Sequence, residues 1–338
     1  MGRYAIRRLL GAIPTLVIIS FVIFAILDLA PGDPTGQLPL TVPPDVRENI
    51  RETLGLNDPF LLSWIKWMRQ MFISEPLNFI EQITPLQFGD GERLRVISWA
   101  SRGPVIDTIV ERLPQTLWVL GFGFIFGIVI AIPVGVISAY KQYSVFDNVG
   151  TFVSMVGYSV PVFFTGLLAI IVFSVWLGWF PSFYDTTHDV SLTDWDSIVF
   201  QFQQSIMPIT VLALFNAAAL SRFTRSSMLD NLGEDYVRTA RSKGLSENRV
   251  LARHVLRNSL IPVTTLIALQ VPGIFAGAII TETIFRINGL GSLLISSIQG
   301  ADVPKVQTLT FIFAVLIVIF NLIADLIYGL LDPRIRYE

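Results

Sequence analysis

The chain has 338 residues, of which 52% are hydrophobic and 15% are charged, with a formal net charge of −2 and a mean hydropathy of +0.62. Soluble domains carry about 25% charged residues, so this composition excludes an ordinary soluble domain and favours a membrane protein. The absence of cysteine excludes disulfides, thiolate metal sites and thiol catalysis, and the two histidines leave little room for a histidine-rich metal site.

The N-terminal segment predicts a first membrane span. Arg3, Arg7 and Arg8 precede roughly 20 mostly apolar residues, whereas the hydrophobic region of a signal peptide has about 7–15 residues. No small-x-small cleavage site follows this segment cleanly. We therefore expect an uncleaved transmembrane helix.

Six stretches are long and apolar enough to span a membrane, which requires about 20 largely apolar residues. They are residues 9–29, 115–139, 150–180, 205–228, 261–284 and 306–331. The third is long enough to tilt, or to begin as a cytoplasmic extension before a kink at Pro161. The sequence therefore predicts an all-α fold, a polytopic membrane protein with six transmembrane helices.

Lysine and arginine gather on one side of these spans, and this asymmetry sets the orientation of a membrane protein. With the N-terminus inside, the basic residues at the inner ends are Arg3, Arg7, Arg8, Lys141, Arg222, Arg225, Arg334, Arg336 and six in residues 235–262. The outer loop 181–204 holds four aspartates and neither lysine nor arginine. We expect a multi-pass protein of a prokaryotic plasma (inner) membrane, with its N- and C-termini in the cytoplasm.

Residues 31–113 mix acidic and basic side chains, and a segment of this length falls outside the charge rule. Two amphipathic pieces in it have apolar residues at four-residue intervals: Val46, Ile50 and Leu54 in the first, and Trp64, Met68 and Phe72 in the second. We expect a small extracytoplasmic cap here, between the first span (1–30) and a core domain with five spans (114–338). The alternative is a pair of interfacial helices that lie on the lipid.

The segment DYVRTARSKGLSENRVLARHVLRNSLIP (235–262) interrupts the apolar pattern. It holds two acidic residues and six basic ones, which are Arg238, Arg241, Lys243, Arg249, Arg253 and Arg257. Local rules predict a helix from Asp235 to Lys243, a stop at Gly244 and a second helix capped by Ser246. The loop 229–260 is then two short helices that protrude under the membrane. On charge alone it is a patch for anionic lipid head groups, worth about 1 kcal/mol per basic residue.

The order of residues in this loop resembles the cytoplasmic loop of ABC-importer permeases of the oligopeptide/dipeptide/nickel family. That loop carries an alanine and, four residues later, a glycine between two helices, and Ala240 and Gly244 stand at these positions. The broader importer pattern continues with isoleucine and proline, where this chain has His254 and Arg257. This departure is usual for the peptide branch of the family.

Further motifs of the same resemblance occur in the family's order along most of the chain. They are PGDP (31–34), RLPQTL (112–117), YSVPVF (158–163), ETIF…GLGSLL (282–294), ADVPKVQ (301–307) and NLIADLIYGLLDPRIR (321–336). Two regions depart from the pattern. Arg286, Ile287 and Asn288 stand where a tryptophan–proline pair usually precedes GLG, and residues 74–103 fit poorly.

The resemblance implies partners and a role for the loop. Such a permease forms a heterodimer with a second homologous permease, and each docks a coupling helix into one of two cytoplasmic ATPase subunits. An extracytoplasmic solute-binding protein delivers the solute, and membrane lipids surround the spans. The implied coupling residues are Arg238, Thr239, Ala240, Arg241, Lys243, Gly244 and Leu245. Arg241, Lys243 and Arg249 would pair with acidic groups on the ATPase, and Gly244 would permit the sharp turn.

The chain lacks the motifs of an enzyme or an ATP site. There is no G-x-x-x-x-G-K-[ST] phosphate loop, and H-E-x-x-H and G-x-S-x-G are also absent. We therefore expect a transport subunit that is not an enzyme and binds no cofactor itself. ATP and Mg would bind to the partner ATPase subunits, and nucleic acid is not an expected partner.

Polar residues within the spans are candidates for a translocation path. They are Asn216, Ser221, Thr281 and Thr283, although serine and threonine also join helices to one another. Asp325, near the end of the last span, is expected to form a structural tie rather than a proton relay. In the second span, Gly123, Gly127, Ala131 and Gly135 repeat every four residues, which suits close helix packing but also arises by chance.

The solute expected from the resemblance is a short peptide, delivered into a path of which this chain forms half. Oligosaccharides, glutathione and nickel remain alternatives, because the binding protein selects the solute in such systems. An ion-coupled secondary transporter or channel would show paired midplane charges and inverted repeats, and neither is clear here. A membrane anchor that uses the basic loop for lipids would not account for the ordered motifs.

Overall fold

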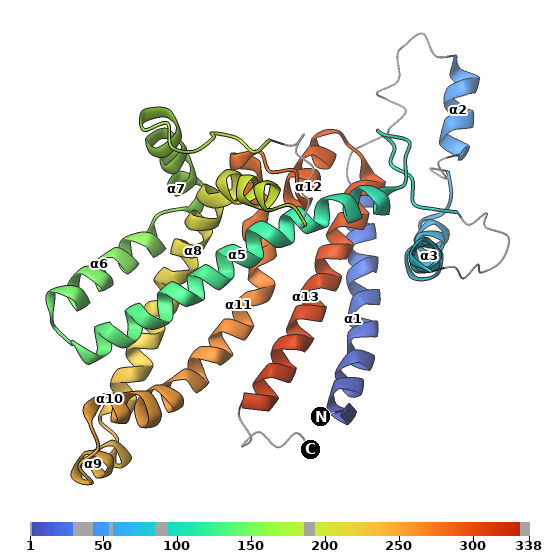
Figure 1. Ribbon diagram of the computed structural model, residues 1–338. Coiled ribbons are helices and arrows are strands. Elements are labelled where there is room, and N and C mark those ends of the chain that lie inside the picture. Colours follow the sequence, from blue (N-terminus) through green and yellow to red (C-terminus); the bar gives the residue numbers. More distant parts are fainter. Residues whose placement is uncertain (1, 30–42, 54–56, 85–93, 186–192, 332–338) are drawn as a thin grey trace. The chain divides into compact units, whose positions relative to one another are not determined.

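The computed structural model describes residues 2–29, 43–53, 57–84, 94–185 and 193–331 (Figure 1). The PGDP motif, Leu54 and the closing DPRIR (332–336) lie outside these residues, as do the side chains of residues 272–278 and 324–331, which include Asp325. Most described residues are helical, and they contain no strand beyond one isolated bridge between Ile97 and Pro104. The expected all-α class is confirmed.

The helices belong to two compact units, which we describe separately. The first unit comprises residues 1–8, 114–292 and 317–338. It takes in most of α5 (Val105–Tyr140) and all of α6 (Val145–Ser159), α7 (Val162–Ala169), η3 (Ile170–Trp176), α8 (Trp195–Leu232), α9 (Asp235–Ser242), α10 (Glu247–Val250), η4 (Leu251–Val255) and α11 (Leu256–Phe285).

The second unit comprises residues 9–113 and 293–316. It takes in most of α1 (Gly2–Asp28) and α12 (Leu290–Gln299), the first part of α13 (Val303–Leu331), and all of α2 (Pro44–Thr53), α3 (Phe60–Arg69), η2 (Gln70–Ser74) and α4 (Glu75–Ile83).

Helices occupy each of the six stretches predicted to span the membrane. By length and composition, four described segments qualify as spans: Leu10–Asp28, Val105–Tyr140, Trp195–Leu232 and Val303–Ile323. The pair formed by α6 and the helix from Val162 to Trp176 raises the number to five if it is one bent span. The fifth predicted stretch lies in α11, part of whose side chains is not described. Six spans and an outer cap therefore stay predictions.

The third predicted span is broken rather than kinked. The axes of α6 and the helix that follows differ by 104°. Val160 is extended, with φ −83° and ψ 127°, and Pro161, with φ −59° and ψ 138°, immediately precedes the next helix. Proline disfavours helical geometry in the residue before it and lacks a backbone N–H, which explains a break at this position.

The four-residue repeat of small residues in α5 packs directly against α8. A Cβ added to Gly123 would lie 2.8 Å from Leu212 Cβ, and one added to Gly127 would lie 2.9 Å from Asn216 Cβ. At Gly135 the added atom would lie 2.6 Å from the carbonyl oxygen of Ser221. Since real Cβ atoms do not approach so closely, the repeat is required by the contact and did not arise by chance.

Two motifs of the sequence meet in a buried carboxylate contact at the junction of α11 and α12. Glu282 is fully buried and accepts hydrogen bonds from Thr116 Oγ1 at 2.7 Å and from the backbone N–H groups of Gly291 at 2.7 Å and Ser292 at 3.0 Å. A side chain at Gly289 would collide with this carboxylate. Glu282 thus satisfies backbone donors at the start of α12, which a helix cannot satisfy by itself.

In the second unit, aromatic side chains of α3 and η2 pack against α1 and α13. The ring of Trp67 lies 5.3 Å from that of Phe311, and Phe24 contacts Phe60 at 5.4 Å. The predicted face was partly wrong, because Trp67 and Met71 are the buried residues whereas Phe72 is 41% exposed. The buried face lies beside the predicted one because Trp67 packs against Phe24 and Phe311, and both contacts come from distant parts of the chain.

The segment that follows α4 is fastened by carboxylates within the same unit. Arg95 donates to Glu75, which is 4% exposed, and to Asp107. Asp302 accepts hydrogen bonds from the hydroxyl of Ser98 and from the backbone N–H of Trp99, the latter at 3.0 Å. These contacts give the ADVPKVQ motif a structural role, since its aspartate holds a loop about 200 residues earlier in the chain.

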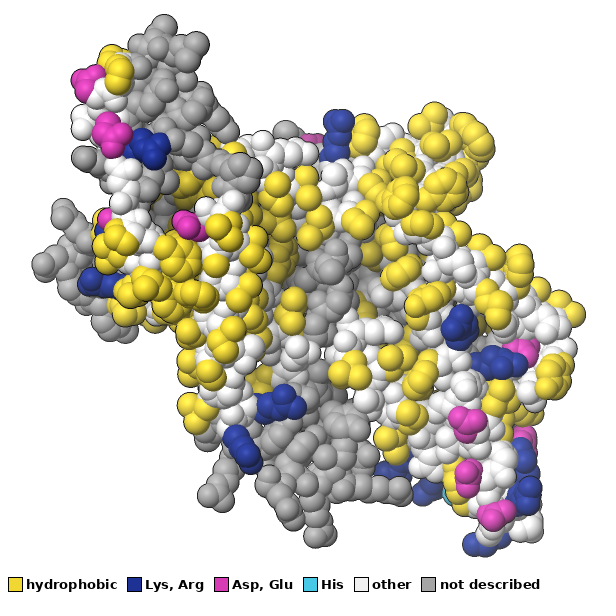
Figure 2. All heavy atoms as spheres, turned by 180° about the vertical axis from the view of Figure 1, so that it is seen from behind, with side chains coloured by type: hydrophobic (Ala, Val, Ile, Leu, Met, Phe, Trp, Pro, Cys, Tyr) yellow, Lys and Arg dark blue, Asp and Glu magenta, His cyan; other side chains and the backbone are white. Residues whose placement is uncertain are grey.

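The helices of the first unit expose apolar side chains of the kind that face lipid. On α6, Phe152 is 67% exposed and Val153 is 58% exposed. Charged side chains gather instead at the end of the unit that carries α9 and α10 (Figure 2). A hydrocarbon environment accounts for the first distribution and an aqueous one for the second.

We expect Gly135→Val to weaken the contact between α5 and α8. Overpacking costs about 1–3 kcal/mol, so the thermal unfolding midpoint of the purified protein in detergent should fall. Gly121→Val is the matched control on the same helix, since a Cβ at Gly121 meets no atom within 4 Å. Equal midpoints for the two variants would contradict the close packing.

Candidate functional site

The basic loop folds as two short helices around a glycine, as its sequence predicts. The helix α9 ends at Ser242, Gly244 follows with φ +72°, and α10 begins at Glu247 (Figure 1). Ser246 occupies the position before α10, but the predicted cap is not formed, because its side chain accepts no hydrogen bond from the first turn; its backbone carbonyl accepts the first helical hydrogen bond from Val250 N at 3.0 Å. A Cβ at Gly244 would meet no atom within 4 Å. The glycine is therefore required by the left-handed backbone and not by lack of space.

The inner face of this loop forms a small hydrophobic core with the ends of α5 and α8. Val237 and Val250 are fully buried, as is Met228 near the end of α8. Ala240 is 5% exposed, and Ala139 of α5 closes the same cluster. We call residues 235–250, α9 to α10, the coupling segment, after the role that the sequence predicts for them. Its core fixes the segment to the two helices that carry it.

The predicted coupling residues divide between this core and the surface. Ala240 belongs to the core, and Leu245 packs against it while half-buried. Arg238, Thr239 and Lys243 are exposed. A helix with one buried and one exposed face presents a defined surface to a partner, and α9 has this form.

Arg241 is paired within the coupling segment. Its guanidinium donates to both carboxylate oxygens of Glu247, with the shorter contact at 2.6 Å, so it bridges the turn around Gly244. This hydrogen bonding lowers the pKa of Glu247 from its ordinary value of 4.5 and raises the pKa of Arg241. A lowered carboxyl pKa means that the pair is formed above pH 4.5 and is lost as the pH falls through the folded-state pKa.

The remaining basic residues of the segment differ from Arg241 in their surroundings. Arg238 lies 3.5 Å from Asp235 in a fully exposed pair. In the part of the chain that the structure describes, no carboxylate lies within 4 Å of Lys243 or Arg249. These two side chains carry charge that the segment itself does not neutralise.

The four residues predicted to line a path lie in different environments. Asn216 is half-buried where α8 packs on Gly127, and Ser221 is buried against α6. Thr281 is buried near the end of α11, and Thr283 is exposed and returns its hydroxyl to the carbonyl of Ile279. Asn216 and Ser221 thus take part in contacts between helices. Their role in a path stays a prediction.

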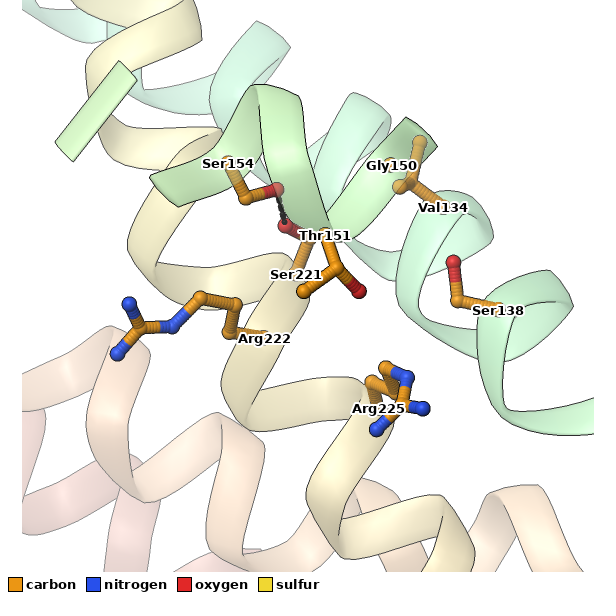
Figure 3. Close-up of a pocket in the computed structure, with 8 residues that line it drawn as sticks. All are labelled: Val134, Ser138, Gly150, Thr151, Ser154, Ser221, Arg222 and Arg225. Atoms are coloured by element: carbon orange, nitrogen blue, oxygen red, sulfur yellow. Dashed lines mark hydrogen bonds between the residues drawn. The ribbon is translucent and has the colours of Figure 1, made fainter. Parts of the chain in front are cut away.

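A small hollow between α5, α6 and α8 brings the predicted path residue Ser221 together with polar groups of α6 that the sequence did not single out (Figure 3). It is open to its surroundings and is lined by Val134, Ser138, Gly150, Thr151, Ser154, Ser221, Arg222 and Arg225. Ser154 and Ser221 share a hydrogen bond of 3.1 Å across it, and Arg225 forms an ion pair with Asp147. The only signal in the sequence is one carboxylate in a short basic loop, which is too weak to predict the pairing.

Long apolar helices, tight α5–α8 packing and a basic two-helix segment at one end define a polytopic helical membrane protein. Two family models match the chain. The "Binding-protein-dependent transport system inner membrane component" matches residues 131–337, and the N-terminal model of the same membrane components matches residues 1–120. The chain therefore belongs to the family of inner-membrane permease components of binding-protein-dependent transport systems, the permeases of ABC importers.

Relatives of the chain are similar to it over their full lengths. It is 41% identical to the "Oligopeptide transport system permease protein AppB" of Bacillus subtilis (strain 168). It is 35% identical to the "Glutathione transport system permease protein GsiC" of Escherichia coli (strain K12). Both comparisons cover 100% of this chain and 100% of the relative.

Solved structures share the fold over about two thirds of the chain. An amino acid ABC transporter aligns with a TM-score of 0.51 and 12% identity, covering 66% of this chain and 94% of that one. The MetNI methionine ABC transporter, in inward-facing conformations, aligns with a TM-score of 0.50 and 16% identity, covering 67% and 97%. At these identities the likeness concerns the fold alone.

We expect Ala240→Leu to loosen the coupling segment. The added atoms overpack its core at a cost of about 1–3 kcal/mol, and 1.4 kcal/mol is a factor of ten in an equilibrium constant. Amide hydrogens of α9 should therefore exchange about tenfold faster. Thr239→Leu is the control, because Thr239 is the residue next to Ala240 and its side chain is exposed. Equal exchange rates of the α9 amides in the two variants would contradict the assignment of Ala240 to the core.

Proposed function

We propose that this chain forms half of the translocation path of an ATP-driven importer for short peptides. The observation that carries the proposal is the full-length identity of 41% to a permease whose name assigns it to oligopeptide transport. A second candidate solute is glutathione, because a glutathione permease is 35% identical over the same length. Both solutes are short amide-linked chains with free carboxylates, so they present similar groups to the path.

The coupling segment is the part of the chain that we assign to ATPase contact. Its apolar face is occupied by its own core, which leaves a basic face for an acidic partner. Within that face Lys243 and Arg249 have no described carboxylate within 4 Å, whereas Arg241 is held by Glu247. We therefore assign direct pairing with the ATPase to Lys243 and Arg249, and assign to Arg241 the task of closing the turn.

The remaining features of the proposal follow from the family. The chain would pair with a second homologous permease, two cytoplasmic ATPase subunits would bind ATP and Mg, and an extracytoplasmic binding protein would deliver the solute. Charge asymmetry supports a bacterial inner membrane with both termini and the coupling segment in the cytoplasm. Residues 31–113 would form the outer cap, and residues 114–338 would form the core domain with five of six spans.

Native mass spectrometry of the chain, co-expressed with its genomic neighbours, tests this assembly. We expect a mass equal to this permease, a second permease and two ATPase subunits, because the coupling segment offers one docking surface per permease. A binding protein retained with a small ligand would identify the solute, and a peptide and glutathione differ in mass. A homo-oligomer, with ATPases expressed but unbound, would contradict the proposal.

Gly244→Val should uncouple ATP hydrolysis from transport. Valine tolerates φ +72° poorly, and strain of about 1–3 kcal/mol would distort the turn. In proteoliposomes that contain the full complex, we expect hydrolysis to continue while uptake per ATP falls about tenfold, the ratio for 1.4 kcal/mol. Gly244→Asn is the control, because asparagine adopts this conformation more readily. Full transport by the valine variant would contradict the role of the turn.

A further inference from the structure

The short turn between α5 and α6 is fastened to α8 by a bidentate ion pair. Asp147 is 1% exposed and accepts from Arg225 Nε at 2.6 Å and from Arg225 Nη2 at 2.8 Å. The same carboxylate accepts from the backbone N–H of Tyr143, a residue with φ +64°, at 2.9 Å. One side chain therefore fixes both the geometry of the turn and its position on α8.

Beyond the ion pair, α6 follows α8 through further specific contacts. Ser154 and Ser221 share a hydrogen bond of 3.1 Å (Figure 3). One turn later, a Cβ at Gly157 would lie 3.4 Å from Ala218 Cβ, an ordinary contact distance. These contacts run from the ion pair toward the break at Pro161, so α6 lies against α8 along most of its length.

The ion pair is also one helical turn from the core of the coupling segment. Arg225 precedes Met228 by three residues on α8, and Met228 packs with Val237 and Ala240 of α9. Ala139 of α5, two residues before Lys141 in the turn, belongs to the same core. The core of the coupling segment and the ion pair thus form two successive layers of contact along α8. The ion pair joins α6 to the layer that the core forms.

We propose that Asp147 and Arg225 are positioning residues that transmit movement of the coupling segment to α6. The proposal rests on the proposed function, since it assumes an ATPase that displaces this segment. A displaced core carries the end of α8 with it, and the bidentate pair holds the turn and α6 to α8 during that movement. Because α6 and the following helix meet at a 104° break, the movement of α6 changes the geometry at Pro161.

A bidentate ion pair between α6 and α8 is suited to transmitting movement from one helix to the other. Two parallel N–H···O bonds fix orientation as well as distance, whereas an apolar contact would allow α6 to slide. The partner groups come from residues 78 positions apart, so the pair is a tertiary contact and not a local cap. Removal of one partner leaves a charge without its counter-ion, and this loosens the link without removing either helix.

The test uses the full complex in proteoliposomes and measures ATP hydrolysis and solute uptake in the same samples. With Asp147→Asn, we expect hydrolysis per assembled complex to persist while uptake per ATP falls about tenfold, within the 5- to 150-fold range typical of coupling between sites. The exchange of charges, Asp147→Arg with Arg225→Asp, should recover part of the uptake. The control is Asp107→Asn, which removes a carboxylate that also contacts an arginine at 2.6 Å but lies outside this unit.

A distance measurement separates transmission from a merely structural role. The chain has no cysteine, so spin labels can be attached at Phe152→Cys on α6 and Ser242→Cys on α9, both exposed positions and neither of them a predicted coupling residue. In the otherwise native complex we expect the same narrow distance distribution with and without ATP, because the two elements move together. In Asp147→Asn we expect the distribution to broaden or shift when ATP binds.

The outcomes are distinct. An unchanged ratio of uptake to hydrolysis and an unchanged distance in Asp147→Asn would overturn the proposal. A fall of hydrolysis and uptake together, in proportion to the amount of assembled complex, would also overturn it, because the pair would then serve stability alone. A complex with the native sequence that neither hydrolyses ATP nor takes up solute would contradict the proposed function itself. That outcome does not depend on the results for the variants.

Discussion

The structure of the first unit depends on the close contact between α5 and α8, where no side-chain atom can be added at the glycines of α5 without a clash. In a membrane, lipid tails are as apolar as side chains, so helices associate through close van der Waals contact and not through the hydrophobic effect. Gly127 and Gly135 of α5 meet α8 at Asn216 and Ser221. The contact fixes the axial register of the two helices. The core of the coupling segment contains Ala139 of α5 and Met228 of α8, so its position follows from that register.

Two buried carboxylates complete this framework along α5. Glu282 contacts Thr116, about a third of the way along the helix, and Asp147 holds the turn that follows the last residue of α5. Burial of a charge is costly unless hydrogen bonds or a counter-ion compensate it. Glu282 receives a hydroxyl and two backbone N–H groups, and Asp147 receives Arg225, so each carboxylate organises the loop around it. In both cases the sequence places a short turn where an acidic side chain can collect its donors.

Sequence reasoning succeeded where the determinant was local. The apolar stretches predicted where helices would lie, and the break at Gly244 followed from the preference of glycine for positive φ. The buried face of α3 was missed because tertiary contacts decide it: Trp67 packs against Phe24 of α1 and Phe311 of α13, which are distant in sequence. The pairing of Asp147 with Arg225 was missed for the same reason. Its partners are far apart in sequence, and only the packing of α6 on α8 brings them together.

For the coupling segment, the sequence predicted the two helices and the glycine turn correctly, but it did not predict which basic side chain is paired within the segment. Charge alone made Arg241 equivalent to Lys243 and Arg249, whereas the structure gives Arg241 to Glu247 across the glycine turn. Exposed ion pairs contribute only about 0–1 kcal/mol, so this pair does little for global stability. It restrains a turn whose glycine otherwise leaves the backbone free. The glycine makes the turn accessible and the ion pair limits its freedom, so the basic face of α9 is presented in one orientation.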